Sequence, residues 1–468
     1  MLQTRGEPEL VVLLGNTPDD DAWAWRVPVQ SAGRPFGDPR SININGRTGL
    51  FMRADDEFMN LDVTGTVRGY ATPYSGHLPH IPGTNDPVLT PLPEVRVSAT
   101  IIGGGAPVVY TAANGTYTVT IGGSGQAVNV NATVGPLIAA AGLYVTIVDA
   151  RDDTTFPPPG LSSCVADPIS ALSASASVTN PASSVTLDLP YSATPATVAE
   201  YHTAQANAVI HAHRCRYYFV DRLYAEIPEL EKHLRIIVNY QSYFGACGGA
   251  FLTTDCGSDG SWNIVLARSG QLLGAGLTCR NTSYSGIIAH EFGHYIHTAL
   301  GFPNGTVSQS FTEGFADAYA IMVNDRREIG RAIRDDESNL RDDPTDSTIN
   351  CQYPITNGSP EICRCSGLTG GSPHNAGQLL SGIWLRMIDE FRGEYGGTNG
   401  LEYARNLHVR WALVTAALPT SSCSSATCAT LNEVLLADDN DANLQNGTPN
   451  DDLIYAAFDA HSISPCID

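Results

Sequence analysis

The residues best placed to do chemistry in this chain lie in the run His290-Glu291-Phe292-Gly293-His294. The run reads H-E-x-x-H and is flanked by apolar residues, which predicts a helix. Residues four apart lie on one face of a helix, so both imidazoles can bind one zinc ion. Glu291 would then lie beside the metal's open position, where it can take a proton from zinc-bound water. The run therefore predicts a zinc site with hydrolytic chemistry.

A catalytic zinc needs a third protein ligand, and Glu313 is the candidate, 19 residues after His294. Asp317 follows four residues later, on the same face of a second predicted helix. One carboxylate can bind zinc while the other accepts the N–H of a ligating histidine and fixes its orientation. The alternative is a solvated pair of surface acids. The segment is otherwise almost wholly apolar, and a buried carboxylate needs a strong partner such as a metal.

The elements that must position these side chains follow from periodicity and from turn signals. We expect strands over 234–240 and 262–267, and helices over 310–323, 374–391, 401–417 and 449–461. A capping box of Thr197 and Glu200 starts an earlier helix that runs towards Phe219. Thr448 and Pro449 mark the N-cap and first turn of the last helix. A β-rich half thus precedes a helical half, with the zinc helix at their junction.

Four segments are expected from changes in composition. They are an irregular or β-rich N-terminal region (1–90), a β-sandwich module (91–150), a Pro-, Ser- and Ala-rich linker (151–194) and a metal-binding domain (195–468). Short β-branched runs and the turn signal Asn114-Gly115, read as a hairpin, predict the all-β sandwich. This stretch resembles the transthyretin-like modules appended to secreted peptidases. The first segment is either a prosegment that occludes the cleft within the chain or an accessory module.

The composition favours an exported protein. The chain has 468 residues, 11 cysteines and a formal net charge of −22. Such acidity argues against nucleic acid or an anionic membrane surface as the partner. The cysteines favour an oxidising compartment and several disulfides. No secretory signal is visible and no apolar stretch is long enough to span a bilayer, so secretion is inferred from the cysteines and the acidity.

Cysteine spacing predicts local disulfides. The expected groups are Cys247 with Cys256, Cys423 with Cys428, and a cluster of Cys351, Cys363 and Cys365. A second zinc site at Cys363 and Cys365 is the alternative for that cluster. One residue between two cysteines fits zinc-ligand spacing poorly, which favours disulfides.

An acidic run before the last predicted helix raises the question of calcium. Asp439, Asp441 and Asn443 alternate as they do at the start of an oxygen-ligand calcium loop. Leu444 stands where a glycine is expected, and no bidentate glutamate follows at the usual distance. Asx-rich loops before a helix also serve as plain turns and caps, so both readings stay open.

With these motifs in place, residues 195–468 resemble the gluzincin metallopeptidases of the thermolysin and fungalysin-like group. In that family H-E-x-x-H is followed by a glutamate zinc ligand and, four residues later, by an aspartate. The resemblance implies a two-lobed α+β metallopeptidase domain. It also implies that His290, His294 and Glu313 bind zinc, that Glu291 is the general base, and that Asp317 accepts a hydrogen bond from His290.

A Ser-Pro-His-Asn segment is similar to the family's histidine-bearing segment, which implies that His374 hydrogen-bonds the oxyanion across the cleft. The chain also departs from the family. The thermolysin branch has a tyrosine between the zinc helix and the third ligand, and residues 296–312 contain none. His297 roughly shares the ligand face with His290 and could compete as a ligand, although it lies one turn too far along the helix.

We therefore expect a secreted zinc-dependent endopeptidase that acts on protein or peptide substrates, with Glu291 assisting the attack of zinc-bound water. Gly249-Ala250-Phe251 is a candidate edge strand for pairing with an extended substrate. The alternatives are a non-proteolytic zinc hydrolase and an adhesive or structural module with an inert zinc site. An intact Glu291 argues against the inert module, because a purely structural site gains nothing from a base.

Overall fold

The computed structural model describes residues 2–4, 9–13, 22–31, 40–45, 51–56, 60–73, 79–81, 83–101, 106–122, 128–134, 145–150, 172–178, 184–193, 196–220, 222, 230, 233–240, 247–253, 262–270, 278–302, 309–336, 340–341, 351–352, 364–365, 373–417, 428–441, 443–461 and 463. The chain divides into two compact units. The first comprises Met1–Gly69, Pro91–Thr133 and Ser173–Pro190, and the second comprises Tyr70–Thr90, Val134–Leu172 and Tyr191–Asp468. The described elements are strands and helices in separate groups, which confirms the predicted α+β class.

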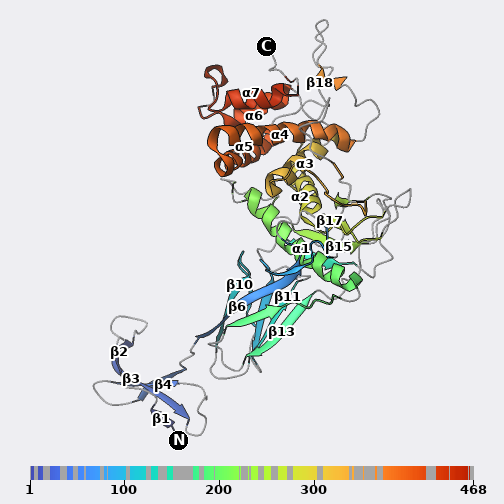
Figure 1. The fold of residues 1–468 in the computed structure, drawn as a ribbon. Helices are drawn as coiled ribbons and strands as arrows, with labels where there is room; N and C mark the ends of the chain where they lie inside the picture. The colour runs from blue at the N-terminus through green and yellow to red at the C-terminus, as the bar shows by residue number, and fades with distance from the viewer. Residues whose placement is uncertain are drawn as a thin grey trace. The chain divides into compact units, whose positions relative to one another are not determined.

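The N-terminal part of the first unit contains an antiparallel sheet. Its strands are β1 (Leu2–Thr4), β2 (Glu9–Leu13), β3 (Ala22–Ser31), β4 (Arg40–Asn45) and β5 (Phe51–Asp56), in the order β1-β3-β4-β5 with β2 also paired to β3 (Figure 1). The sequence showed no sustained periodicity over residues 1–90, yet β3 alternates small and large apolar residues in the run AWAW. That short alternation was the available signal for a strand.

Two further sheets of the first unit form the β module. Their strands are β6 (Asn60–Ala71), β8 (Arg96–Ile101), β9 (Val108–Tyr110), β10 (Thr116–Gly122), β11 (Val128–Thr133), β13 (Ser173–Val178) and β14 (Val185–Asp188), in the orders β10-β6-β14 and β13-β11-β8-β9. Strand β7 (Val88–Pro91) lies at the boundary of the two units. Each of the two sheets has a buried face, with Val63 and Val67 on one and Val97 and Val130 on the other.

The hairpin predicted at Asn114-Gly115 is wrong, although the turn itself is present. Gly115 has a φ of 76° and donates its N–H to the carbonyl of Ala112. The flanking strands pair in different sheets, β9 with β8 and β10 with β6. The turn therefore passes from one sheet to the other, because seven residues of β10 find their antiparallel partner in the N-terminal region.

The boundaries predicted for the sandwich and the linker also change. The segment 151–194 contains β13 and β14, and β13 reads SASASV and pairs antiparallel with β11. Its small, weakly apolar side chains hid a strand whose face is only partly buried. Strand β12 (Val145–Asp149), assigned to the sandwich from sequence, instead pairs in parallel with β15 in the second unit.

The second unit combines a four-stranded sheet with helices. The sheet has the order β12-β15-β17-β16, with β15 at Leu234–Tyr240, β17 at Trp262–Ala267 and β16 at Gly249–Leu252. The strands predicted over 234–240 and 262–267 are confirmed. The helices are α1 (Ala196–Val220), α2 (Ser285–Ala299), α3 (Gln309–Asn324), α4 (Pro373–Tyr395), α5 (Gly397–Ala417), α6 (Cys428–Asp438) and α7 (Asp451–Asp459), and the short pair β18 (Cys351–Gln352) and β19 (Arg364–Cys365) lies before α4. Of these helices, only α6 had no counterpart among the predicted ones.

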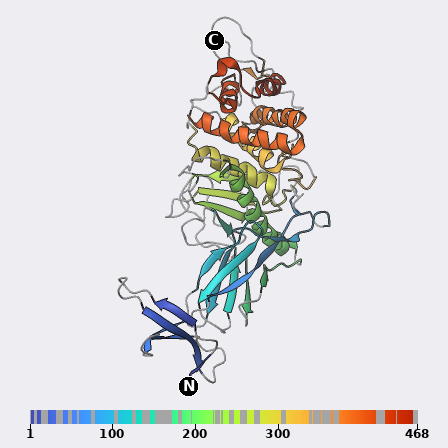
Figure 2. The same ribbon diagram turned by 90° about the vertical axis from the view of Figure 1, so that its left-hand side faces the viewer.

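The helices of this unit form successive layers on the sheet. Figures 1 and 2 show α2 and α3 next to the strands, α4 and α5 beyond them, and α6 and α7 on the far side. A buried aromatic cluster of Phe315, Trp384, His408 and Trp411 joins α3, α4 and α5. The α2 helix thus lies between the sheet and a large apolar core, and this packing holds the H-E-x-x-H run in place.

Two predicted helix caps are corrected. Helix α1 begins at Ala196, so Thr197 lies inside the helix rather than at its N-cap. Glu200 accepts hydrogen bonds from Ser269 and Asn281, which ties α1 to the segment after β17. Helix α7 begins at Asp451 with Asn450 as its N-cap, two residues later than predicted. Thr448 instead donates its hydroxyl to Asp438.

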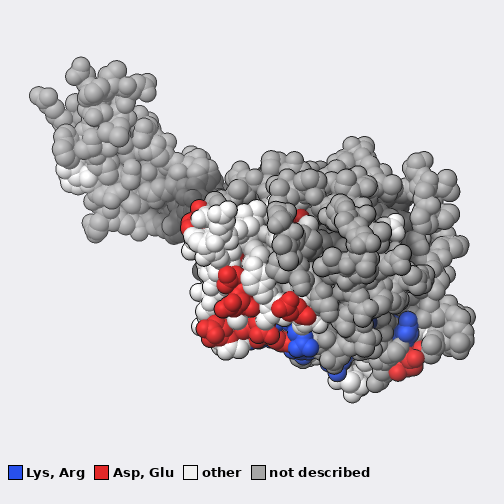
Figure 3. Space-filling view, turned by 90° about the horizontal axis from the view of Figure 1, so that it is seen from above, with Lys and Arg blue, Asp and Glu red and all other residues white. Residues whose placement is uncertain are grey.

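The helices and the surface charge both bear on the predicted partners. None of the described helices is both long enough and apolar enough to cross a bilayer. On the face shown in Figure 3, acidic side chains outnumber basic ones among the described residues, in line with the formal net charge of −22.

Candidate metal centre

The candidate metal centre lies where α2 crosses α3, and two glycines permit the close approach. A Cβ atom on Gly293 would lie 2.7 Å from the Cα atom of Ala316, so the two helices pack backbone against backbone. A Cβ atom on Gly314 would lie 2.6 Å from the carbonyl oxygen of Gly377, which brings the start of α4 equally close to α3. The glycine inside the H-E-x-x-H run therefore lets side chains of α3 reach the two histidines.

Three potential ligand atoms meet at this crossing. His290 Nε2 lies 3.2 Å from His294 Nε2 and 3.3 Å from Glu313 Oε2. His294 Nε2 lies 3.6 Å from the same Glu313 oxygen. Tetrahedral zinc with ligand bonds of about 2.0–2.2 Å separates its ligand atoms by about 3.3–3.6 Å. The three distances therefore fit one face of a zinc tetrahedron.

His374 reaches the same group from the start of α4. Its Nδ1 lies 2.6 Å from Glu313 Oε2, and the ligand atoms of His290, Glu313 and His374 all lie within 4.8 Å of one another, so these residues could hold a metal ion. A 2.6 Å contact is a hydrogen bond, and it is too short for two ligands of one zinc ion. His294 keeps the longer separation that a shared zinc requires. The distances therefore favour His294 over His374 as the third zinc ligand.

Asp317 lies behind His290, on the side away from Glu313. Its Oδ1 lies 2.7 Å from His290 Nδ1, and the guanidinium of Arg341 bonds the same oxygen. All three side chains are buried. Burial alone would raise the pKa of Asp317, but the charges of Arg341 and His290 hold it below its ordinary value. An ionised Asp317 orients the His290 ring so that Nε2 faces Glu313.

The imidazoles and carboxylates of the centre shift one another's protonation. Burial would lower the pKa of His290, but the charge and hydrogen bond of Asp317 raise it to about 10. Burial would raise the pKa of Glu313, but hydrogen bonds from His290, His294 and His374 hold it well below its ordinary value. The carboxylate thus faces protons that a metal ion would replace, and metal binding would release them.

Glu291 points from α2 towards the edge strand β16. Burial raises the pKa of its carboxyl group, and the charges of His290 and His294 oppose that shift. A Cβ atom on Gly249 would lie 2.8 Å from Glu291 Cγ and 2.9 Å from Oε1. The backbone of β16 therefore lies directly against the carboxylate, and any side chain at position 249 would displace it.

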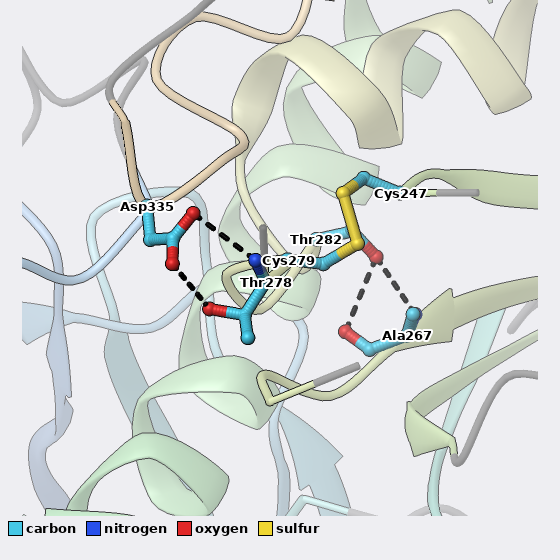
Figure 4. The surroundings of a disulfide bond; sticks show 6 residues. All are labelled: Cys247, Ala267, Thr278, Cys279, Thr282 and Asp335. Carbon is cyan, nitrogen blue, oxygen red and sulfur yellow. Dashed lines mark hydrogen bonds between the residues drawn. A yellow bond between two sulfur atoms is a disulfide. The ribbon is translucent and has the colours of Figure 1, made fainter. Parts of the chain in front are cut away.

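A disulfide fixes the start of β16. Cys247 is bonded to Cys279, in the segment just ahead of α2 (Figure 4). The predicted pairing of Cys247 with Cys256 is wrong, because Cys247 is bonded to Cys279, a residue 32 positions away. The other cysteines are placed only in part. Cys351 and Cys365 are backbone partners in β18 and β19, Cys215 is a buried free thiol, and Cys256, Cys363 and Cys423 lie outside the described residues.

Hydrogen bonds hold the same segment on either side of Cys279 (Figure 4). Thr278 donates its N–H and its hydroxyl to the carboxylate of Asp335. The Thr282 hydroxyl accepts the N–H of Ala267 at 2.7 Å and donates to its carbonyl at 3.3 Å, which joins the segment to β17. The segment that leads into α2 is thus tied to both β16 and β17.

His297 lies next to His294 rather than next to the shared ligand position. Its Nε2 lies 3.1 Å from His294 Nδ1, on the side of the ring away from His294 Nε2. The ring stacks on Phe302 and meets the edge of Phe315. Burial lowers the pKa of His297 to about 3, so its ring is neutral. This position argues against the hypothesis that His297 competes for zinc.

The structure brings all the predicted site residues together, and it adds two more. The predicted residues at the centre are His290, Glu291, His294, Glu313, Asp317 and His374. The sequence contains no spacing rule that links Arg341 to Asp317, and the only hint was that a buried carboxylate needs a cation. Gly249 was expected as part of a candidate edge strand, which is present as β16 at the end of the sheet order, but its contact with Glu291 was not expected.

Comparison with known proteins assigns the chain to no family. No protein-family model matches it, and no curated protein matches its sequence. The function must therefore be inferred from the geometry of the site.

Proposed function

We propose that the chain is a secreted zinc-dependent endopeptidase of the gluzincin type. The observation that carries this proposal is the triangle of His290 Nε2, His294 Nε2 and Glu313 Oε2, with sides of 3.2, 3.3 and 3.6 Å. Two imidazoles and one carboxylate are a donor set that suits catalytic zinc. Zinc, when bound, would polarise the scissile carbonyl as a Lewis acid and lower the pKa of water.

Glu291 supports hydrolysis rather than a purely structural metal. Its carboxylate lies beside the ligand triangle, one residue from His290, and its raised pKa moves it towards the range that suits a proton acceptor near neutral pH. Glu291 would take the proton of the attacking water and pass it to the leaving amine. The backbone of β16 at Gly249 would hold the carboxylate in position for both transfers.

Strand β16 supports an extended peptide as the substrate. It ends the sheet order β12-β15-β17-β16 and pairs antiparallel with β17 on one side. The backbone groups of such a strand can bind an extended peptide through main-chain hydrogen bonds. Because Gly249 contacts Glu291, a peptide along this edge would pass beside the general base.

His374 would contribute to stabilising the oxyanion. Its side chain is half exposed and is held at Glu313 by the 2.6 Å hydrogen bond. The N–H that bonds Glu313 in this structure would instead be donated to the negative charge that develops on the carbonyl oxygen. The resemblance to the thermolysin and fungalysin-like group implies the same role.

The architecture and the disulfide are consistent with the remaining parts of the proposal. A sheet with an edge strand, followed by the zinc helix and then by packed helices, is the order that a thermolysin-like two-lobed domain requires. The Cys247–Cys279 disulfide favours an oxidising compartment, which supports secretion. Protein or peptide substrates follow from the reaction class.

The test is cleavage of casein or of a quenched peptide by the full chain, with and without a zinc chelator. We expect chelation to abolish cleavage and added zinc to restore it. Glu291→Gln should retain zinc but lower kcat by about 10²–10⁴-fold, because it removes the proton acceptor. Unaltered cleavage by this variant would exclude the mechanism.

The same experiment separates the two alternatives. Zinc binding without peptide cleavage, but with hydrolysis of a simple ester or amide, would indicate a non-proteolytic hydrolase. Zinc binding with no hydrolysis of any kind would indicate the inert adhesive or structural module.

A further inference from the structure

The two histidines of the H-E-x-x-H run are supported by different kinds of group. His290 Nδ1 lies 2.7 Å from the Asp317 carboxylate, whereas His294 Nδ1 lies 3.1 Å from Nε2 of another histidine, His297. A metal-ligating histidine almost always donates its second ring N–H to a partner, which fixes the tautomer and the ring orientation. His294 thus needs an acceptor, and none of the roles assigned above provides one.

The geometry points to His297 as the positioning residue that accepts the Nδ1–H of His294 and so prepares its Nε2 for the metal. This inference rests on the proposed metal site at His290, His294 and Glu313. A neutral imidazole carries one N–H and one lone pair. If Nε2 of His294 presents its lone pair towards Glu313, its proton must reside on Nδ1. The ring nitrogen found 3.1 Å from that atom is His297 Nε2, which then accepts.

The surroundings of His297 keep it in this position. Its ring stacks on Phe302 with 5.8 Å between centroids, and it meets Phe315 edge-on at 6.1 Å. The rings of His294 and His297 are nearly perpendicular, at 83°, as an N–H directed at a ring-nitrogen lone pair allows. Phe302 donates its backbone N–H to the carbonyl of His297. This hydrogen bond holds Phe302, whose ring stacks on the His297 ring, at the end of α2.

His297 therefore acts through His294 and would not contact zinc. A carboxylate partner adds negative charge behind a ligand, whereas an imidazole partner adds none. Both ligating histidines would thus be held in position by a hydrogen bond, but only His290 would have a negatively charged partner behind it. The spacing H-E-x-x-H-x-x-H encodes this arrangement, because residues three apart are neighbours on a helix.

The test is zinc affinity of the full chain, measured by competition with a chromophoric chelator. We expect His297→Leu to weaken zinc binding by about 10–100-fold, the range typical for loss of an outer partner. His297→Gln should stay within about threefold of the wild type, because its amide oxygen can accept the same N–H. The visible spectrum of the cobalt-substituted chain should change in the leucine variant and be restored in the glutamine variant.

His408→Leu is the matched control. His408 is a buried histidine that stacks on Phe315, but its Nδ1 bonds the Tyr218 hydroxyl instead of a ligand. We expect it to leave zinc affinity unchanged, even where thermal unfolding shows a loss of stability. Equal weakening in His297→Leu and His408→Leu would overturn the inference, since core packing would then explain both.

The outcome also separates this inference from the proposed function. A wild-type chain that binds no zinc would overturn both. Zinc binding that is weakened by Asp317→Asn but not by His297→Leu would keep the proposed site and overturn the role of His297 alone.

Discussion

Two parts of the second unit gather carboxylates, and they hold them in opposite ways. At the crossing of α2 and α3, Glu313 and Asp317 face imidazole and guanidinium groups that come from other elements. At α6 and the turn that follows, Glu433 accepts a hydroxyl. Asp438 accepts hydroxyl and amide groups, and its Oδ1 lies 3.9 Å from the Arg410 guanidinium. We call the first the metal centre and the second, residues 433–452, the acidic segment.

The difference shows in the protonation of the buried carboxyl groups. Imidazole hydrogen bonds overcome burial and hold the pKa of Glu313 well below its ordinary value. Burial raises the pKa of Glu433 to about 7, because the hydrogen bond from Thr415 lowers the pKa by less than burial raises it. Burial thus raises the pKa of a carboxyl group, and charged or strongly donating partners lower it and keep the group anionic and fit for a cation.

Hydrogen bonds within the turn after α6 account for its alternating Asp and Asn residues without a metal. Asp439, Asp441 and Asn443 each accept a backbone N–H from the residue two positions later. Asp441 also accepts from the Asn446 side chain. Within the described residues of the acidic segment, no three His, Cys, Asp or Glu ligand atoms lie close enough to share a metal ion. Alternating acids in one loop therefore make local turns, whereas the metal centre joins three helices.

The largest expected effect separates the two regions by zinc affinity. Glu313→Gln should weaken zinc binding by more than the roughly 100-fold upper range for outer partners, because it removes the anionic member of the ligand triangle. Asp438→Asn, an equally conservative change at a buried acid of α6, should leave zinc affinity unchanged. Chelator competition measures both. Similar losses in the two variants would erase the distinction between the regions.

The next effect concerns pH and the acidic segment. The pKa of Glu433 is about 7 in the folded chain, against an ordinary value of 4.5. Between these pH values the folded chain therefore holds a proton that the unfolded chain has released. Its contribution to stability therefore falls as pH rises from 4.5 to 7, by about 3 kcal/mol in total. Glu433→Gln should raise the free energy of unfolding by about 2–3 kcal/mol at pH 8 and change it little at pH 4.5.

Urea denaturation of wild type and Glu433→Gln at the two pH values checks this, since all other groups cancel in the difference. An equal difference at both pH values would mean that Glu433 has the same pKa in the folded and the unfolded chain. In that case burial would not distinguish the acidic segment from the metal centre.

The metal centre was easier to predict from the sequence than the acidic segment, because its residues lie in helices with a clear apolar periodicity. The spacing of His290 and His294, and of Glu313 and Asp317, follows from one helical period and apolar surroundings. The chain could not reveal that Cys247 meets Cys279, because their contact depends on how β16 and β17 pair. Helix α6 was missed because its apolar residues show little sidedness, with buried positions scattered around it.

In the β module, strands that are far apart in the sequence pair with each other, so local sequence patterns could not predict the pairing. The turn at Gly115 was recognised, but the partner of β10 lies in β6, which no turn signal near residue 115 can indicate. The strand β13 has too little apolar surface to be recognised alone, and it is defined by its register with β11.

A smaller effect, on kcat rather than on zinc affinity, tests whether β16 holds Glu291 in position. Gly249→Ala should lower kcat by about tenfold while leaving zinc affinity unchanged, because the added Cβ must displace the Glu291 side chain, whose Oε1 lies 2.9 Å from it. Gly248→Ala is the matched control, since a Cβ atom there meets nothing within 4 Å. Peptide cleavage kinetics and chelator competition measure the two quantities. Equal kinetics in both variants would show that β16 does not position the base.

The smallest effect is expected in the acidic turn. Asp441→Ala removes two hydrogen bonds at an exposed position and should lower the free energy of unfolding by less than about 1 kcal/mol, with no change in zinc affinity or cleavage. Millimolar calcium should leave the melting temperature of wild type and variant unchanged, because the side-chain oxygens serve the turn. A calcium-dependent rise in wild type that Asp441→Ala abolishes would instead establish a calcium loop, and the two acidic regions would then both be cation sites.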